Sequence, residues 1–355
     1  MIRCAIVGGG LAGFTAYQTL RRAFTPDEIV VFDACGDPTA AFAQRARAIR
    51  QTHMRSESDG HCLPTSFPGL AVRESLRRLS PAPVLRSLAS SYNPTVDDFL
   101  AHVSELRERS DWDSSVRRER VEAIDAEDGF FRVRDVEAPY VLVATGHPGL
   151  NVPDELGGDE RVVHSYEPHE YASTVTVVGA GLAAATEWAN ALAAGSTVIS
   201  VRRREPVRRR LNVPREWFSR RALAGYHRLD HATRAETLRS LLAPSFPHGP
   251  RWDEAAARVR VERRVNGTEQ VIAATGFRRG FHHDPLLRRL VAENALETYR
   301  DWIVLDRDST VPALSDGRRA LALAGVAGQW AFPAADTLVG AKYAARGLLA
   351  RCRTR

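Results

Sequence analysis

Short unbroken apolar runs recur along the chain, and each is followed by glycine or by a polar turn. Ile2–Val7, Ile29–Phe32 and Tyr140–Thr145 show no alternation of apolar and polar positions. This pattern is typical of parallel strands buried on both faces. Leu11–Phe24 and Pro94–Arg109 instead repeat apolar positions at helical spacing. The order strand, helix, strand predicts a βαβ unit at the amino end of the chain.

The same plan returns in the second half of the chain. A strand begins near Thr174, a glycine-rich turn and a helix follow, and another strand ends before Arg202. Two strands end on Ala-Thr-Gly, at Ala144–Gly146 and Ala274–Gly276, and we expect the chain to cross between domains there. The duplication predicts an α/β fold with two Rossmann-like dinucleotide-binding domains, one inserted in the other. Residues 1–157 and 278–355 would form the first domain, and residues 158–277 the inserted one.

The stretches between these units are less regular. Ala40–Arg50 predicts a helix, and Gln51–Pro68 predicts a loop rich in His, Ser and Pro. Val121–Val136 predicts a β-meander. Gly149–Glu170, rich in Pro, Gly and acidic residues, predicts a linker, and Ala334–Leu349 predicts a helix near the carboxyl end.

The first glycine-rich turn has the pattern GxGxxG, formed by Gly8, Gly10 and Gly13. The first glycine permits a tight turn, the second lets a diphosphate approach the backbone, and the third lets the helix pack on the strand. Asp33 lies twenty residues after Gly13, where a carboxylate can bind the free ribose hydroxyls of FAD. An ordinary turn is the alternative, but the combination favours a dinucleotide. The expected contacts are Gly8, Gly10, Leu11, Ala12, Gly13, Asp33 and Ala34.

The second turn has the variant GxGxxA, and the strand that completes this unit is followed by arginines where the first unit has an acidic residue. Arg204 lies twenty residues after Ala184, at the offset that Asp33 occupies in the first unit. A carboxylate there would repel the 2′-phosphate of NADPH, whereas guanidinium groups bind phosphate. An arginine-rich surface is the alternative, but the position of the charge reversal favours NADPH. The expected contacts are Gly179, Gly181, Leu182, Ala184, Arg202, Arg203 and Arg204.

Composition narrows the class of protein. The chain has 355 residues, is 44% hydrophobic and carries a formal net charge of +6, with Lys342 as its only lysine. No recognisable nucleic-acid-binding motif accompanies this charge, so we expect no nucleic-acid partner. No apolar run is long enough to span a membrane, and no signal peptide precedes the first strand, so we expect a cytoplasmic protein. The four cysteines form no CxxC pair, and we expect no metal site.

Several segments resemble FAD- and NAD(P)H-dependent oxidoreductases with paired Rossmann domains. "AATGF" at Ala273–Phe277 resembles the Ala-Thr-Gly-Tyr signature of N-hydroxylating flavin monooxygenases. "THMRSESDGHCLPTSF" resembles their Met-Arg-Asp/Ser-Pro segment, although Glu57 replaces the proline, and "YNPTVDDFLAHV" is similar to a helix start in the same group. The Baeyer–Villiger fingerprint F-x-G-x-x-x-H is absent, but His164-Ser165 resembles the pair that follows it in flavin monooxygenases.

The strongest resemblance is at the carboxyl end, in "AGVAGQWAFPAADTLVGAKYAARGL", which is similar to the segment that closes the FAD site in bacterial monooxygenase-like flavoproteins. The resemblance implies a helix N-terminus at Ala334–Asp336 against the flavin. It also implies catalytic roles for His53, Arg55 and His61, with exposed loop residues as the alternative for each. The further cofactor contacts expected are Thr145, Gly146, Thr275, Gly276, Gly325, Pro333, Ala334 and Ala335.

These features predict an FAD-dependent oxidoreductase that takes hydride from NADPH and uses dioxygen to hydroxylate a small nucleophilic substrate, such as an amine. One alternative is a flavoprotein reductase that passes electrons to a protein or quinone. Another is a protein without catalytic activity that senses NADPH. The sequence indicates neither the substrate nor the oligomeric state.

Overall fold

The first sheet of the computed structural model has five parallel strands, and its core lies on both faces. The structure describes residues 1–55, 63–64, 68–89 and 92–353. In the first of these strands along the chain, Cys4 and Ile6 face one apolar cluster, whereas Ala5 and Val7 face another, so this strand is buried on both sides. In order across the sheet, the strands are β17 (Ala320–Leu323), β7 (Tyr140–Val143), β1 (Cys4–Val7), β2 (Ile29–Phe32) and β3 (Val116–Arg117).

The second sheet repeats this arrangement about a separate core. Its central strands are parallel. They follow the order of the first sheet, so that β9 (Thr174–Val178) corresponds to β1 and β10 (Thr197–Val201) corresponds to β2. The edge strands differ, because β17 comes from the carboxyl end of the chain whereas β8 precedes β9. Across the sheet the strands are β13 (Arg260–Glu262), β10 (Thr197–Val201), β9 (Thr174–Val178), β14 (Gln270–Ala273) and β8 (Val162–His164).

The remaining strands are short and lie outside the two main sheets. An antiparallel meander consists of β4 (Asp125–Glu127), β5 (Phe130–Val133) and β6 (Val136–Ala138). Two strand pairs are formed by β11 (Val207–Arg208) with β12 (Ser245–Phe246), and by β15 (Thr298–Tyr299) with β16 (Trp302–Ile303). The meander confirms the prediction made for Val121–Val136.

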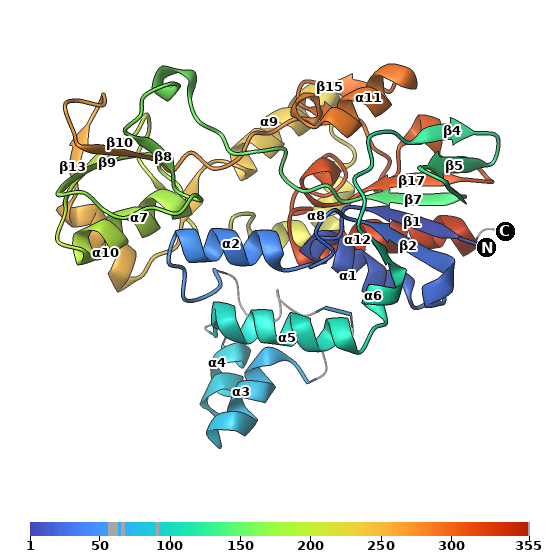
Figure 1. The fold of residues 1–355 in the computed structure, drawn as a ribbon, viewed down its shortest axis with the longest axis horizontal. Coiled ribbons are helices and arrows are strands. Elements are labelled where there is room, and N and C mark those ends of the chain that lie inside the picture. The colour runs from blue at the N-terminus through green and yellow to red at the C-terminus, as the bar shows by residue number, and fades with distance from the viewer. Residues whose placement is uncertain (56–62, 65–67, 90–91, 354–355) are drawn as a thin grey trace.

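Helices cover the sheets and fill the region between them. In Figure 1, α1 and α12 pack together against the first sheet, while α7 and α10 lie beside the second. The helices are α1 (Leu11–Leu20), α2 (Ala40–Ala48), α3 (Leu70–Arg78), α4 (Ala82–Leu88), α5 (Val96–Glu108), α6 (Trp112–Ser115), α7 (Leu182–Ala193), α8 (Arg220–Tyr226), α9 (His231–Leu241), α10 (Pro250–Arg258), α11 (Pro285–Glu293) and α12 (Leu338–Arg353). None of these described helices combines the length and the apolar character that a membrane crossing requires.

Two sequence-based expectations about elements are wrong. The stretch Gly149–Glu170 is not only a linker, because it contributes β8 to the second sheet. The helix near the carboxyl end begins at Leu338 and not at Ala334. Thr337 explains the later start, since its side chain accepts a hydrogen bond from the Gly340 N–H at 3.1 Å, as an N-terminal cap does.

Candidate functional site

The first glycine-rich turn has room for a ligand at one glycine and none at the other two. Gly8 has φ +100°, and a side chain there would collide with the carbonyl group of Ala144. A side chain on Gly13 would collide with the Gly8 carbonyl oxygen. Nothing lies within 4 Å of the position that a Gly10 side chain would take. The turn therefore packs tightly on the sheet and leaves open space at Gly10.

The open space lies at the N-terminus of α1. Gly10 precedes this helix, no side chain caps it, and no acidic residue lies in its first turn. Leu11 and Ala12, in that first turn, are partly exposed. Free backbone N–H groups and the positive end of a helix dipole together favour a diphosphate. The residues present thus fit the diphosphate of a dinucleotide.

Asp33 is held at the end of β2 by backbone groups. One carboxylate oxygen accepts a hydrogen bond from the Gly9 N–H at 2.7 Å. The other accepts from the N–H groups of Cys35 and Gly36 at 2.9 and 2.7 Å. The neighbouring Ala34 is exposed. Because a carboxylate has about four acceptor positions, capacity remains for ribose hydroxyls.

The segment between β17 and α12 lies beside the start of α1. A side chain on Gly325, which has φ +65°, would come within 3.8 Å of the Ala12 Cβ. Pro333, Ala334 and Ala335 are buried. Because α12 begins at Leu338, the expected helix N-terminus at Ala334–Asp336 does not exist.

The second turn repeats the first but is more enclosed. Gly179 has φ +144°, and a side chain there would collide with the Ala274 carbonyl oxygen. Gly181 precedes α7, and no side chain caps this helix. A Cβ on Gly181 would lie 3.6 Å from the Pro244 Cβ, so the segment before β12 forms one wall of this space. Ala184 is fully buried.

The three arginines after β10 point in different ways. The side chain of Arg202 is 10% exposed, contacts the Trp188 ring and pairs with Glu205 at 3.1 Å. Arg203 is largely exposed and pairs with the exposed Glu155 at 3.1 Å. Arg204 is exposed, and no ion pair or hydrogen bond joins its side chain to another described residue. Arg203 and Arg204 are therefore more accessible to a phosphate than Arg202.

The two Ala-Thr-Gly endings lie side by side where the chain crosses between the domains. The Asn151 N–H donates to the Gly276 carbonyl at 3.0 Å, and the Arg278 N–H donates to the Gly149 carbonyl at 2.9 Å. The Thr275 hydroxyl donates to the Asn151 carbonyl. The two crossing segments thus pair with each other.

Thr145 connects the first of these crossings to another element. Its hydroxyl donates to Asp284, the N-terminal cap of α11, at 2.6 Å. Gly146 and Gly276 have φ +79° and +76°, and a side chain on either would meet open space. Both glycines therefore border open space.

Of the three residues with expected catalytic roles, the structure describes His53 and Arg55, and these two point to different parts of the molecule. His53 is exposed and lies beside Thr95, at the start of α5. Arg55 instead points to the inserted domain, where it donates to the Arg209 carbonyl at 2.9 Å and to the Ser245 hydroxyl at 3.0 Å. Burial, together with the nearby Arg209, lowers the pKa of Arg55 to about 10. His61 lies outside the described residues.

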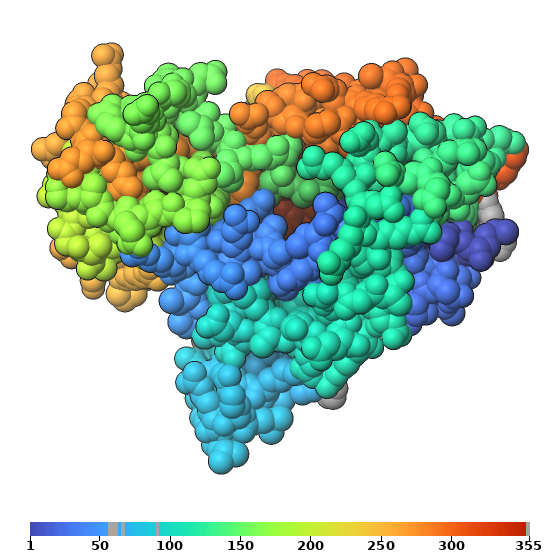
Figure 2. Space-filling view, viewed as in Figure 1, coloured from blue at the N-terminus to red at the C-terminus, as the bar shows by residue number. Residues whose placement is uncertain are grey.

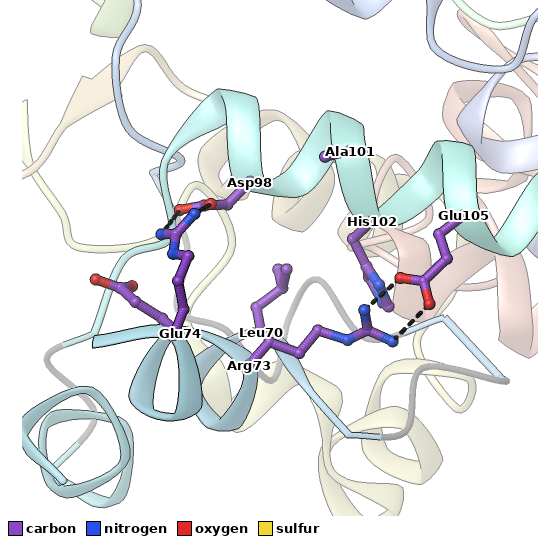
Figure 3. A pocket seen from close by; sticks show the side chains of 8 residues that line it. Leu70, Arg73, Glu74, Asp98, Ala101, His102 and Glu105 are labelled. Carbon is purple, nitrogen blue, oxygen red and sulfur yellow. Dashed lines mark hydrogen bonds and ion pairs between the residues drawn. The ribbon is translucent and has the colours of Figure 1, made fainter. Parts of the chain in front are cut away.

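A pocket of about 170 Å³ lies apart from both glycine-rich turns, between α3 and α5 (Figure 3). Arg73 pairs with Glu105, and Arg77 pairs with Asp98 at 2.7 Å across this pocket. Burial, together with the charge of Arg73, lowers the pKa of His102 to about 4. Each of these ion pairs balances its own charges, and together the ion pairs join the two helices.

A hollow is visible in the space-filling view. In Figure 2 it lies near the centre of the face, bordered by α2 and by the chain that follows β7. The described residues include no group of three or more His, Cys, Asp or Glu side chains placed to hold a metal ion. Sequence reasoning missed Arg45 and His147, which both contact the ring of Phe277, and Arg279, whose charge acts on His147.

Two Rossmann domains, each with a glycine-rich turn that fits a diphosphate, define a two-domain dinucleotide-dependent oxidoreductase. The chain belongs to the pyridine nucleotide-disulphide oxidoreductase family, whose model matches residues 2–222. It is accordingly an FAD-dependent oxidoreductase. A comparison with curated protein sequences finds no match.

Solved structures with the same fold include hydroxylases and a reductase. An ornithine hydroxylase from Pseudomonas aeruginosa has a TM-score of 0.71 and 16% identity, with 99% of this chain and 100% of that chain covered. An ornithine N-hydroxylase from Kutzneria sp. 744 has a TM-score of 0.72 and 16% identity, with 99% and 98% covered. A bacillithiol disulfide reductase from Bacillus cereus has a TM-score of 0.60 and 14% identity, with 99% of each chain covered. At these identities the likeness shows the fold alone.

Proposed function

We propose that this protein is an NADPH-dependent flavin monooxygenase that hydroxylates a small nucleophile such as an amine. In the balanced reaction, substrate, dioxygen, NADPH and a proton give hydroxylated substrate, NADP⁺ and water. Residues 1–157 and 278–355 would hold FAD, and residues 158–277 would hold NADPH. Bound FAD supplies the electron-transfer and oxygen chemistry.

The protein's own residues would bind and orient the two cofactors. The N-terminus of α1 at Gly10 would hold the FAD diphosphate, and Asp33 would hold the ribose. The N-terminus of α7 would hold the NADPH diphosphate, with Pro244 excluding water on one side. Arg203 and Arg204 would hold the 2′-phosphate.

The cysteine pattern is the observation that favours a monooxygenase over a disulphide reductase. The sequence has no CxxC pair, and no disulphide joins the described Cys4, Cys35 and Cys352. Cys4 is buried in β1, and burial raises the pKa of its thiol well above its usual range. A thiol in that state is a poor nucleophile for disulphide exchange. The fold shared with two ornithine hydroxylases supports the same choice.

A reductase that passes electrons to a protein or quinone is the second candidate. The fold shared with a bacillithiol disulfide reductase supports it. This candidate differs from the first in what happens to the electrons, since a reductase transfers them to its acceptor without consuming dioxygen. A protein that only senses NADPH would bind the nucleotide without turnover.

Absorbance and product analysis test the proposal. The purified protein should be yellow, and NADPH should bleach it without air. A panel of small amines should then be tested for hydroxylated product, NADPH consumption and hydrogen peroxide. A hydroxylated product formed in proportion to NADPH supports the monooxygenase. Rapid reduction of a quinone with no hydroxylated product from any amine would favour the reductase, and binding of NADPH without bleaching would favour the sensor.

A further inference from the structure

The two helices α3 and α4 pack together as a hairpin that exposes five large apolar side chains. On α3, Val72 and Leu76 lie four residues apart and so share one side of the helix, and Leu79 follows at its end. On α4, Leu85 and Leu88 lie three residues apart. The exposed fractions of the five range from 40% to 93%. We call these residues the hairpin surface: Val72, Leu76, Leu79, Leu85 and Leu88.

Exposed apolar side chains of this size are rare elsewhere in the protein. In the part of the chain that the structure describes, the others are Met1, Val207 in β11 and Val261 in β13. A single exposed apolar residue is ordinary, whereas several on one small unit are typical of an interaction surface. The concentration on α3 and α4 therefore indicates that the hairpin contacts a partner.

The packing of α4 leads to the same conclusion. A short helix is only marginally stable in water and depends on the packing of its apolar side. Pro83 is the one buried residue of α4, all of which the structure describes, whereas Leu85 and Leu88 are exposed. The side chains that would best stabilise α4 by burial are thus left in water.

Leu79 is unfavourable for two separate reasons in a single chain. It ends α3 in the left-handed conformation, with φ +49°, a position that glycine usually occupies because a side chain is strained there. Its side chain is also 93% exposed, so no packing offsets the strain. Burial against a partner would compensate for both effects.

The charges of the hairpin restrict what this partner is. Three of its four arginines are paired with carboxylates: Arg73 with Glu105, Arg77 with Asp98 and Arg78 with Glu74. The guanidinium carbon of the fourth, Arg86, lies 5.8 Å from the centre of the Tyr92 ring. Arginines that already have counter-ions attract an anionic membrane or an acidic protein only weakly.

A second copy of the same chain suits such a surface. A two-fold contact places the same patch of both molecules together, and this requires that few like charges oppose each other. The shape of the molecule also permits it. Figures 1 and 2 show α3 and α4 as a tip that projects beyond α5. Two such tips can meet without a collision between the bodies of the molecules.

We propose that two copies of this chain associate through the hairpin surface, with α3 and α4 of each copy packed together about a two-fold axis. The exposed leucines would then lie between four helices, as in the core of a helix bundle. A standard interface buries about 800 Å² per partner, and two short helices offer less, so we expect a dissociation constant of about micromolar order. This inference is independent of the cofactor assignment.

Sedimentation equilibrium of the purified full chain, from about 1 to about 200 μM, tests the inference and should show a monomer–dimer equilibrium. Leu76→Gln and Leu88→Gln should each weaken association at least about tenfold, because a two-fold contact loses each apolar side chain twice. Val261→Gln is the matched control, since Val261 is 49% exposed on another element, and it should leave association unchanged.

Leu79→Gly separates association from folding. Glycine adopts φ +49° without strain, so this variant should keep or raise the thermal stability of the monomer and still weaken the dimer. Thermal unfolding at a concentration below the dissociation constant measures the stability. A Leu79→Gly protein that associates as tightly as the original would show that Leu79 lies outside the contact and would contradict the proposed interface.

Two further results would overturn the inference. A protein that sediments as a monomer at every concentration does not form the dimer, and a dimer that persists in both leucine variants uses another surface. Flotation with vesicles of phosphatidylcholine and phosphatidylglycerol tests the competing partner. If the monomer floats with these vesicles and Leu76→Gln and Leu88→Gln do not, the hairpin surface contacts a membrane and not a second copy.

Discussion

The three glycines of the first turn differ in what a side chain would meet. Side chains at Gly8 and Gly13 would collide with the protein itself, whereas one at Gly10 would enter open space. Gly10 also has φ −64°, which any residue adopts without strain. Gly8 and Gly13 therefore act in folding, and Gly10 can be changed to examine ligand binding alone.

We expect Gly10→Val to give a folded protein without FAD, because the new side chain occupies the diphosphate position. Flavin absorbance relative to protein absorbance measures the FAD content, and thermal unfolding measures the folding. Gly225→Val is the matched control, since Gly225 also faces open space but lies in α8. A folded Gly10→Val protein with full FAD content would show that the cofactor binds elsewhere.

The arginines after β10 allow a second test at the scale of residues. The double change Arg203→Ala, Arg204→Ala should raise the KM for NADPH at least about a hundredfold, since each charge-assisted contact contributes about 1.5–3 kcal/mol. The KM for NADH should stay nearly constant. Arg202→Ala should affect nucleotide preference less and stability more, because Arg202 packs on Trp188. Equal KM values for NADH and NADPH in the original protein would contradict this assignment.

Among the elements, α7 is tied to the β8–β9 connection by a buried ion pair. His169 lies 3.2 Å from the fully buried Glu187, which also accepts a hydrogen bond from the Tyr171 hydroxyl at 2.7 Å. Burial disfavours the charged imidazole of His169, but hydrogen bonds to Glu187 and to the Glu167 carbonyl, with the Glu187 charge, outweigh it and raise the pKa. The protonated histidine thus stabilises the native state.

Because the pKa of His169 is raised in the native state, the direction in which the stability of the protein changes with pH can be predicted. The stabilisation is complete below the unfolded-state pKa of about 6.5 and is lost as the pH rises through the raised native value. We expect thermal unfolding between about pH 6 and 9 to show this loss in the original protein and not in His169→Gln. His248→Gln removes an exposed histidine and should keep the pH dependence. Parallel curves for the original protein and His169→Gln would contradict the assignment.

For the whole molecule, Arg55 connects the two domains. Its guanidinium donates to the carbonyls of Arg209, Arg210 and Ser245 and to the Ser245 hydroxyl, at 2.9 to 3.2 Å. Asn190 adds a second connection by donating to the Ile49 carbonyl at 2.8 Å. These bonds fix how the inserted domain faces the first one, and hydride transfer depends on that orientation.

We expect Arg55→Lys to keep its FAD but to slow flavin reduction at saturating NADPH by about ten- to a hundredfold, since small misplacements of reacting groups have effects of this size. A lysine cannot reproduce the planar set of four hydrogen bonds. Anaerobic stopped-flow absorbance measures the rate. Arg73→Lys is the control, because Arg73 pairs with Glu105 far from the domain contact. An unchanged reduction rate would show that Arg55 does not set the orientation.

The amino-acid sequence by itself determined the two βαβ units, their order and their glycine-rich turns. These features depend on local rules: unbroken apolar runs form buried strands, and Gly8 and Gly13 are required by contacts within one short unit. The same local reasoning misplaced the start of α12, because the capping role of Thr337 was not recognised. It also missed β8, whose pairing with β14 joins residues more than a hundred positions apart.

Only the tertiary structure decided which side chains meet between the domains. Arg45 and His147 are far apart in the sequence and carry no motif, yet both contact the ring of Phe277. Arg55 was expected near the substrate, but its guanidinium binds the backbone of the inserted domain. Charge pairing and desolvation depend on distances in space, so whether an arginine has a counter-ion is decided by the fold and not by its sequence neighbours.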